Sequence, residues 1–192
     1  MKTEEKLSQE HDSPAKGMVL RPVGYIKNEI KKPLLAAGED GISMQGETET
    51  ARADMRKMRK RPSEIIINKD LIEVLDGIEG YSHLMVLYWA HRVPEQGRSL
   101  TKVHPTGRKE FPLVGIFSTC SPARPNPVLM TVVRLTRRKG NVLEVTGLDA
   151  VDGSPVVDIK PYVKNFYPQE EVLTPEWMQQ IQREVARENL EK

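Results

Sequence analysis

The most constraining feature of this sequence is a segment, Phe117–Val128, that holds three prolines within six residues: Pro122, Pro125 and Pro127. Each proline fixes its own φ at about −65° and pushes the preceding residue out of the helical region. The segment therefore cannot form a helix or a central strand. The sequence predicts an extended or turning loop with little conformational freedom left to lose on binding.

This loop separates two apolar runs, residues 113–117 and 128–135, which are typical of strands. Loops on a rigid scaffold often carry binding or catalytic groups, although a rigid connector has the same composition. Both interpretations stay open from the residues alone. The loop carries a dense set of hydrogen-bonding side chains: Ser118, Thr119, Cys120, Ser121, Arg124 and Asn126.

Composition excludes several classes of protein. Because the net charge is only +2, the chain could bind a polyanion only through a local basic patch. The single cysteine excludes an internal disulfide and a cysteine-based zinc cluster. The first residues lead into no apolar leader, and no apolar run approaches the roughly 18 residues that span a bilayer. We expect a cytoplasmic, soluble protein without a membrane segment.

Short β-rich segments with few helices predict a mainly β chain that forms a small barrel or closed sheet. Lys69–Gly77 is expected to form a short helix that ends at Gly77, and a second helix is expected after Thr174. We read Tyr81–His91 as a strand buried on both faces, and the chain around Pro22 and Gly24 as an edge strand or bulge. The other expected strands are Ser63–Asn68, Leu143–Leu148 and Val156–Lys160.

The chain divides into three parts. Residues 1–17 are predicted to be a disordered polar tail, residues 18–168 one domain with a charged insertion at 39–62, and residues 169–192 a C-terminal helix. The helix should pack on the domain or on a partner chain through one apolar stripe. That stripe consists of Trp177, Met178, Ile181 and Val185.

The end of the insertion is strongly basic. Its one-sided charge would suit nucleic-acid phosphates, although charge runs are usually solvated loops without a ligand. The cations concerned are Arg56, Lys57, Arg59, Lys60 and Arg61.

Few residues outside the loop indicate chemistry. His83 and His91 lie at the two ends of one expected strand, roughly 26 Å apart, so they cannot share a metal ion and we expect no metal site. Cys120 is either a nucleophile or a small semi-buried residue. Asp149 or Asp152 could hold a ribose hydroxyl pair or act as a base, but Asp152 is better explained by a turn with Gly153.

Four stretches together resemble the TsaA-like family, which is also called the YaeB or TrmO family. They are the segments 21–26 (RPVGYI), 75–84 (LDGIEGYSHL), 115–127 with its RPNP end, and 148–162 (LDAVDGSPVVDIKPY). The resemblance implies a small β-barrel that binds S-adenosylmethionine and methylates N6 of threonylcarbamoyladenosine at tRNA position 37. It also implies a homodimer with the ligand near the subunit boundary.

Matching positions carry the family's site onto this sequence. Beyond the family pattern, we hypothesise that Arg124 and Asn126 position the acceptor nucleotide, that Asp149 has a catalytic as well as a cofactor role, and that the basic segment 56–61 binds tRNA phosphates. The cofactor contacts would fall on His91, Arg92, Cys120, Met130, Thr146, Gly147, Leu148 and Asp149.

The sequence departs from the family pattern at one position in the loop and at one position directly after it. Cys120 stands where the family has an arginine, so a fixed charge and five donors are missing, and Leu129 stands where the family has a glycine. The altered loop leaves room for two alternatives: a methyltransferase of the same fold with a non-tRNA acceptor, and a non-enzymatic S-adenosylmethionine-binding module.

Overall fold

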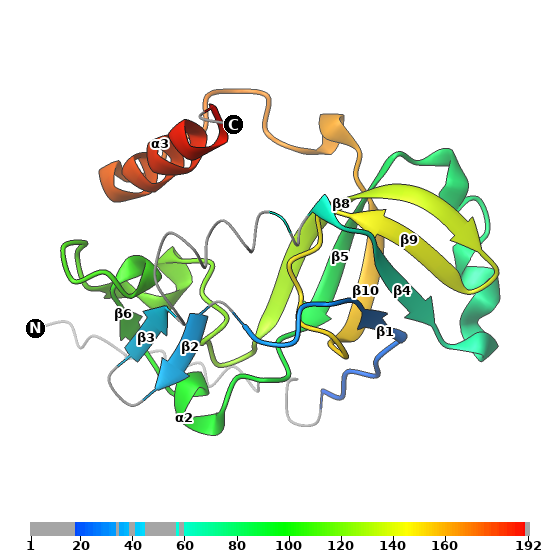
Figure 1. The fold of residues 1–192 in the computed structure, drawn as a ribbon, viewed down its shortest axis with the longest axis horizontal. Helices are drawn as coiled ribbons and strands as arrows, with labels where there is room; N and C mark the ends of the chain where they lie inside the picture. The colour runs from blue at the N-terminus through cyan, green and yellow to red at the C-terminus, as the bar shows by residue number, and fades with distance from the viewer. Residues whose placement is uncertain (1–17, 34, 39–40, 45–56, 58–59, 191–192) are drawn as a thin grey trace, which may run out of the picture.

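The core of the molecule is a closed antiparallel barrel whose strands follow the order β1-β10-β5-β8-β9-β4 (Figure 1). The computed structural model describes residues 18–190 apart from 34, 39–40, 45–56 and 58–59. The expected mainly β, closed sheet is confirmed. The barrel strands are β1 (Gly24–Lys27), β4 (Ser63–Ile67), β5 (His83–Trp89), β8 (Val128–Lys139), β9 (Val142–Thr146) and β10 (Pro155–Pro161).

Alternation of side chains along each strand builds the barrel core. In β5 every second residue is buried, and its other apolar residues are only half-buried on the outer face, so the prediction that this strand is buried on both faces was wrong. An antiparallel sheet that faces solvent on one side needs only one apolar face. The core includes Ile26, Ile65, Ile67, Leu84, Val86, Tyr88, Val133, Leu143, Val145 and Val156.

The barrel closes at β1, which pairs with β4 on one side and with β10 on the other. Gly24 lies opposite both Ile67 and Val156. A Cβ atom at Gly24 would lie 2.2 Å from the carbonyl oxygen of Ile66, which is backbone and cannot move aside. The glycine that we read as part of an edge strand or bulge is therefore a requirement of barrel closure.

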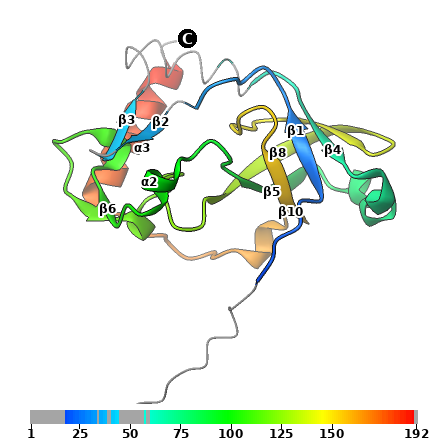
Figure 2. The same ribbon diagram turned by 90° about the horizontal axis from the view of Figure 1, so that it is seen from below.

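A second group of short elements lies beside the barrel (Figures 1 and 2). The expected strand at 113–117 is a two-residue strand followed by a 3-10 turn. The group comprises the hairpin β2 (Leu35–Gly38) and β3 (Gly41–Met44), α2 (Glu95–Arg98), and the pair β6 (Lys102–Val103) and β7 (Val114–Gly115). The 3-10 helices are η1 (Lys69–Leu75), η2 (Ile78–Gly80), η3 (Pro105–Gly107), η4 (Ile116–Ser118) and η5 (Lys164–Phe166). The short helix expected at Lys69–Gly77 is therefore a 3-10 helix that ends just before Gly77.

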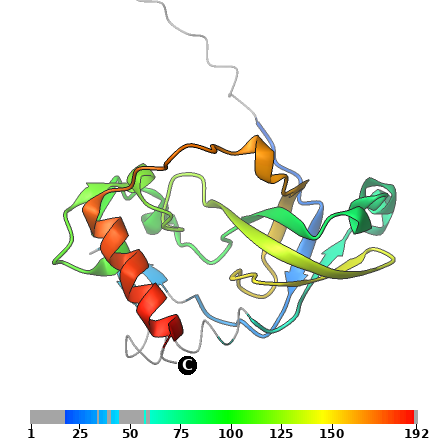
Figure 3. The same ribbon diagram turned by 90° about the horizontal axis from the view of Figure 1, so that it is seen from above.

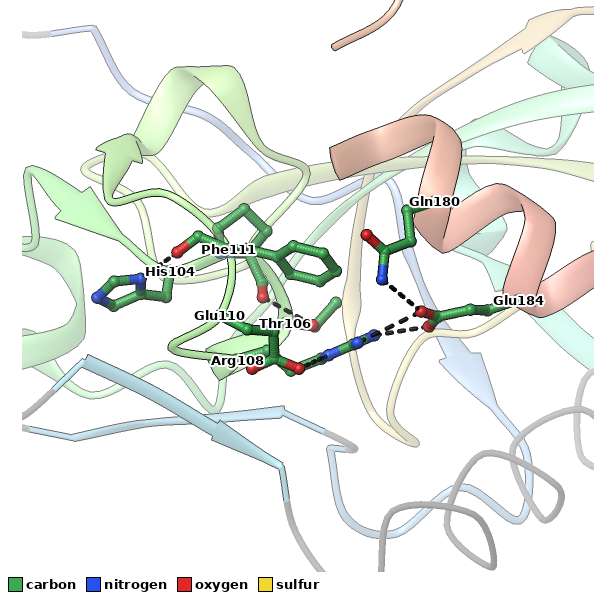
Figure 4. Close-up of polar contacts among 8 residues, drawn as sticks. His104, Thr106, Arg108, Glu110, Phe111, Gln180 and Glu184 are labelled. Atoms are coloured by element: carbon green, nitrogen blue, oxygen red, sulfur yellow. Dashed lines mark hydrogen bonds and ion pairs between the residues drawn. The ribbon is translucent and has the colours of Figure 1, made fainter. Parts of the chain in front are cut away.

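The C-terminal helix α3 (Glu176–Leu190) packs against this second group rather than against the barrel (Figures 3 and 4). The Trp177 ring lies 6.5 Å from the Phe111 ring between centroids, with the two planes tilted by 50°. Arg108 lies over the same Phe111 ring and donates from Nη1 and Nη2 to the carboxylate of Glu184, at 2.6 and 3.3 Å. Of the predicted apolar stripe, Trp177, Met178 and Ile181 are half-buried, whereas Val185 is exposed.

Replacing Glu184 with alanine is expected to loosen α3 while leaving the barrel intact. The fork-shaped pairing of Arg108 with Glu184 is half-buried and is worth about 1 kcal/mol, so its loss should speed local opening of the helix about fivefold. Hydrogen exchange read by mass spectrometry measures this for peptides of α3 and of the barrel. Arg183→Ala, on the exposed face of α3, is the control, and equal exchange in the two variants would contradict the anchoring role.

In the part of the chain that the structure describes, no helix has the length and apolar character needed to cross a membrane. The predicted tail at residues 1–17 and most of the predicted insertion at 39–62 lie outside the described residues.

Candidate functional site

The proline-rich loop is joined directly to the exit of β5. The amide of Ala90 donates to the carbonyl of Pro127 at 2.8 Å, and Trp89 pairs with Val128 where β8 begins. His91, which follows Ala90 in the chain, forms a hydrogen bond of 3.2 Å with the Ser154 hydroxyl through its Nδ1. The loop, the end of β5 and the turn before β10 therefore meet at one end of the barrel.

The chain after β9 continues alongside β8 toward the same place. Thr146 pairs with Arg134, and Gly147 adopts a φ of +93° close to the backbone of Val132 and Val133. A positive φ favours glycine, so this residue turns the chain without strain. Asp149 then accepts a hydrogen bond of 2.6 Å from the hydroxyl of Thr131.

Asp149 is held from a second strand as well. The Tyr88 hydroxyl of β5 donates to the same oxygen, Oδ1, at 3.0 Å. Tyr88 and Thr131 are both buried, whereas Asp149 is half-buried. Met130, which directly precedes Thr131 on β8, is 58% exposed on the outer face. A carboxylate and an apolar thioether thus flank the start of β8.

The Arg124 side chain stabilises the proline-rich loop by donating hydrogen bonds to its backbone. Its Nε donates to the carbonyl of Ser121 at 2.8 Å, and its Nη2 donates to the carbonyl of Thr119. The Ser121 hydroxyl in turn accepts from the amide of Ala123. Arg124 is half-buried and Asn126 is exposed. The predicted rigidity of the loop therefore comes from a guanidinium as well as from the prolines.

The Asp152 side chain stabilises the turn that precedes β10. It accepts hydrogen bonds from the Asn28 amide at 2.9 Å and from Lys31 Nζ at 2.7 Å. The Lys31 ammonium, followed by the Asn28 amide, lowers the pKa of Asp152 below its ordinary value. Gly153 follows with a φ of +77°. The interpretation of Asp152–Gly153 as a turn is confirmed, and Asp149 is the better candidate for chemistry.

The surroundings of His91 favour its neutral form. Burial, and then the nearby Arg92 guanidinium, lower its pKa from the ordinary 6.5, against a smaller opposite effect of Asp152. A neutral imidazole whose Nδ1 faces the Ser154 hydroxyl can donate or accept at Nε2 according to its tautomer. His91 can therefore contribute a directed hydrogen bond without adding a second positive charge beside Arg92.

Two site residues differ from what the sequence suggested. Cys120 is exposed, so the interpretation of a small semi-buried residue was wrong. The side chain of Leu148 is 1% exposed and belongs to the barrel core. Leu148 therefore cannot supply the apolar wall expected of its side chain, whereas Met130 is 58% exposed.

The basic segment is only partly described. Lys57, Lys60 and Arg61 are exposed, and Arg61 pairs with Glu29, whereas Arg56 and Arg59 lie outside the described residues.

Two residues of the candidate site, Tyr88 and Thr131, were not predicted from the sequence. Alternation in β5 places Tyr88 inside the barrel, and a buried tyrosine hydroxyl needs a partner, which was the available signal.

Comparison with known proteins places the chain in a family. The model of the tRNA-methyltransferase O N-terminal domain matches residues 45–167. A probable S-adenosyl-L-methionine-binding protein of Methanothermobacter thermautotrophicus is 37% identical over 147 residues, 77% of this chain and 91% of that protein. The human tRNA (adenine(37)-N6)-methyltransferase is 29% identical over 158 residues, 82% of this chain and 33% of that protein.

Solved structures share the fold. The crystal structure of TrmO from Pseudomonas aeruginosa aligns with a TM-score of 0.56 at 24% identity, over 82% of this chain and 61% of that one. A second TrmO structure aligns at 0.57 and 25% identity, over 84% of this chain and 64% of that one. This chain therefore spans less than two thirds of each of these two solved chains. With the family model covering residues 45–167, the chain belongs to the TrmO family.

Proposed function

We propose that this protein transfers a methyl group from S-adenosylmethionine to N6 of threonylcarbamoyladenosine at position 37 of tRNA. The observation that carries the proposal is the match to the TrmO domain over residues 45–167, a range that contains each proposed cofactor contact from His91 to Asp149. The coarser function, S-adenosylmethionine-dependent methyl transfer, follows from the family. The relatives named as tRNA (adenine(37)-N6)-methyltransferases support the acceptor.

The chemistry of the groups around the start of β8 fits the cofactor. S-adenosylmethionine, when bound, supplies an electrophilic methyl group on a positively charged sulfonium. The Asp149 carboxylate can accept from ribose hydroxyls or face that charge, and the Met130 side chain offers an apolar wall. Main-chain groups at Gly147 and Leu148 can pair with an adenine edge, because Gly147 turns the backbone there with a φ of +93°.

The proline-rich loop is proposed to position the acceptor. Methyl transfer needs alignment of the accepting nitrogen with the methyl group more than it needs covalent chemistry from the protein. Arg124 keeps the loop in one shape through its bonds to Ser121 and Thr119, and Asn126 remains exposed for a base or ribose. Lys57 and Lys60 are proposed to contact tRNA phosphates, because both are exposed.

A second candidate function is methyl transfer to another acceptor. The observation that favours it is the exposed thiol of Cys120, at a loop position where the family pattern has a guanidinium. Without that fixed charge the loop has one cation fewer with which to hold a phosphate. A binding module without catalysis is the remaining alternative.

One incubation separates the three possibilities. The protein is mixed with methyl-labelled S-adenosylmethionine, tRNA that carries threonylcarbamoyladenosine, and a metabolite extract, and both fractions are analysed by mass spectrometry. We expect labelled methyl on the threonylcarbamoyladenosine nucleoside and none when the tRNA lacks that modification. Label confined to small metabolites would favour the second candidate. Cofactor binding with no label in either fraction would favour the non-enzymatic module.

A further inference from the structure

Two buried hydroxyls from different strands converge on the carboxylate at the candidate site. Tyr88 Oη and Thr131 Oγ1 both donate to Asp149 Oδ1, at 3.0 and 2.6 Å. Tyr88 is 4% exposed and Thr131 is 8% exposed, so both donors are shielded from water. The three residues are distant in sequence and meet because β5, β8 and β9 are neighbours in the barrel.

The barrel register fixes where these hydroxyls lie. Tyr88 pairs with Leu129, and Val86 pairs with Thr131, so Thr131 is the diagonal neighbour of Tyr88 on the inner face of β5 and β8. Diagonal neighbours on one face of an antiparallel pair lie about 7–8 Å apart between their backbones, which a tyrosine side chain can span. The ring of Tyr88 is part of the barrel core, and this leaves its hydroxyl little freedom to turn elsewhere.

Asp149 itself lies on a segment without regular structure between β9 and β10. A carboxylate on such a segment can rotate about two side-chain bonds unless other groups restrain it. Two donors aimed at one oxygen from rigid strands provide that restraint, because hydrogen bonds to a charged acceptor are shorter and stronger than neutral ones.

We propose that Tyr88 and Thr131 are positioning residues that fix the rotamer of Asp149 for S-adenosylmethionine. They act through Asp149 and do not touch the cofactor. With Oδ1 held by the protein, the carboxylate keeps one orientation toward ribose hydroxyls or the sulfonium. This inference rests on the proposed use of S-adenosylmethionine, but not on tRNA as the acceptor.

Titration calorimetry with S-adenosylmethionine tests the inference. Tyr88→Phe and Thr131→Val each remove one hydroxyl while keeping side-chain shape, and each is expected to weaken binding about tenfold. Thr131→Ser keeps the hydroxyl and should bind within about twofold of the wild type. Tyr81→Phe and Thr136→Val are matched controls, since Tyr81 is exposed and the Thr136 hydroxyl bonds to the carbonyl of Glu144.

An Asp149→Ala background separates positioning from a general effect on folding. If Tyr88 acts through Asp149, Tyr88→Phe should cause no further loss of cofactor affinity there. Urea unfolding of the same variants identifies any that bind weakly because they are unstable. A further tenfold loss in the Asp149→Ala background would overturn the inference, as would unchanged affinity in both Tyr88→Phe and Thr131→Val. Wild-type protein that fails to bind S-adenosylmethionine would instead contradict the proposed function, and this inference with it.

Discussion

Asp149→Asn is expected to weaken binding of S-adenosylmethionine by about a hundredfold, which corresponds to about 2.7 kcal/mol. The amide keeps the shape of the side chain and can still accept from Tyr88 or Thr131. It removes the negative charge that the site offers to the sulfonium, and it replaces one acceptor oxygen with a donor. Calorimetry gives the dissociation constant, and methyl transfer at low cofactor concentration should fall by a similar factor.

Asp158→Asn is the matched control for this variant. Asp158 is on β10, where it pairs with Lys160 at 2.7 Å, and its side chain is 45% exposed. The same chemical change there should leave cofactor affinity unaltered. If Asp149→Asn bound the cofactor as tightly as Asp158→Asn, Asp149 would not face the ligand and the assignment of the site would be wrong.

Gly24→Ala is expected to lower the free energy of unfolding by about 3 kcal/mol or more. A new Cβ would lie 2.2 Å from the Ile66 carbonyl oxygen and 2.9 Å from the Ile67 Cα, both on β4. Because these are backbone atoms, β1 must move away from β4 and the hydrogen-bonded closure of the barrel must weaken. Urea denaturation followed by circular dichroism measures the loss.

Gly80→Ala serves as the control for the glycine substitution. A Cβ at Gly80 would meet nothing within 4 Å, and its φ is not positive, so the change should alter stability by less than about 1 kcal/mol. Equal stability of the two variants would mean that β1 and β4 do not approach as closely as the structure has them.

Local sequence signals predicted much of the barrel. The isoleucines of β4 and the turn at Asp152–Gly153 were identified because they depend on neighbouring residues alone. The outer face of β5 was misread because Met85, Leu87 and Trp89 are apolar yet only half-buried. Apolar composition cannot distinguish a strand covered on both faces from one whose outer face is partly open to solvent.

The candidate site was only partly predictable for a different reason. The resemblance to the TrmO family supplied Asp149, but the donors that hold it lie 61 and 18 residues away along the chain. The Arg108–Glu184 anchor of α3 spans 76 residues. Contacts of that range depend on strand register and on the packing of α3, which no window of sequence contains.

The residues expected to bind phosphate remain a prediction. Arg61 is engaged by Glu29, so its charge is already partly neutralised. The homodimer expected from the family is likewise a prediction, and so is the role of Asn126 in holding the acceptor.

A crystal structure with S-adenosylhomocysteine, the demethylated product, tests the central assignment most directly. We predict that a ribose hydroxyl or the sulfur lies within about 3.5 Å of the Asp149 carboxylate. We also predict that the adenine contacts the main chain of Gly147 or Leu148, with the proline-rich loop alongside. Density for the ligand away from the ends of β5 and β8, for example against the hairpin β2–β3, would contradict this assignment.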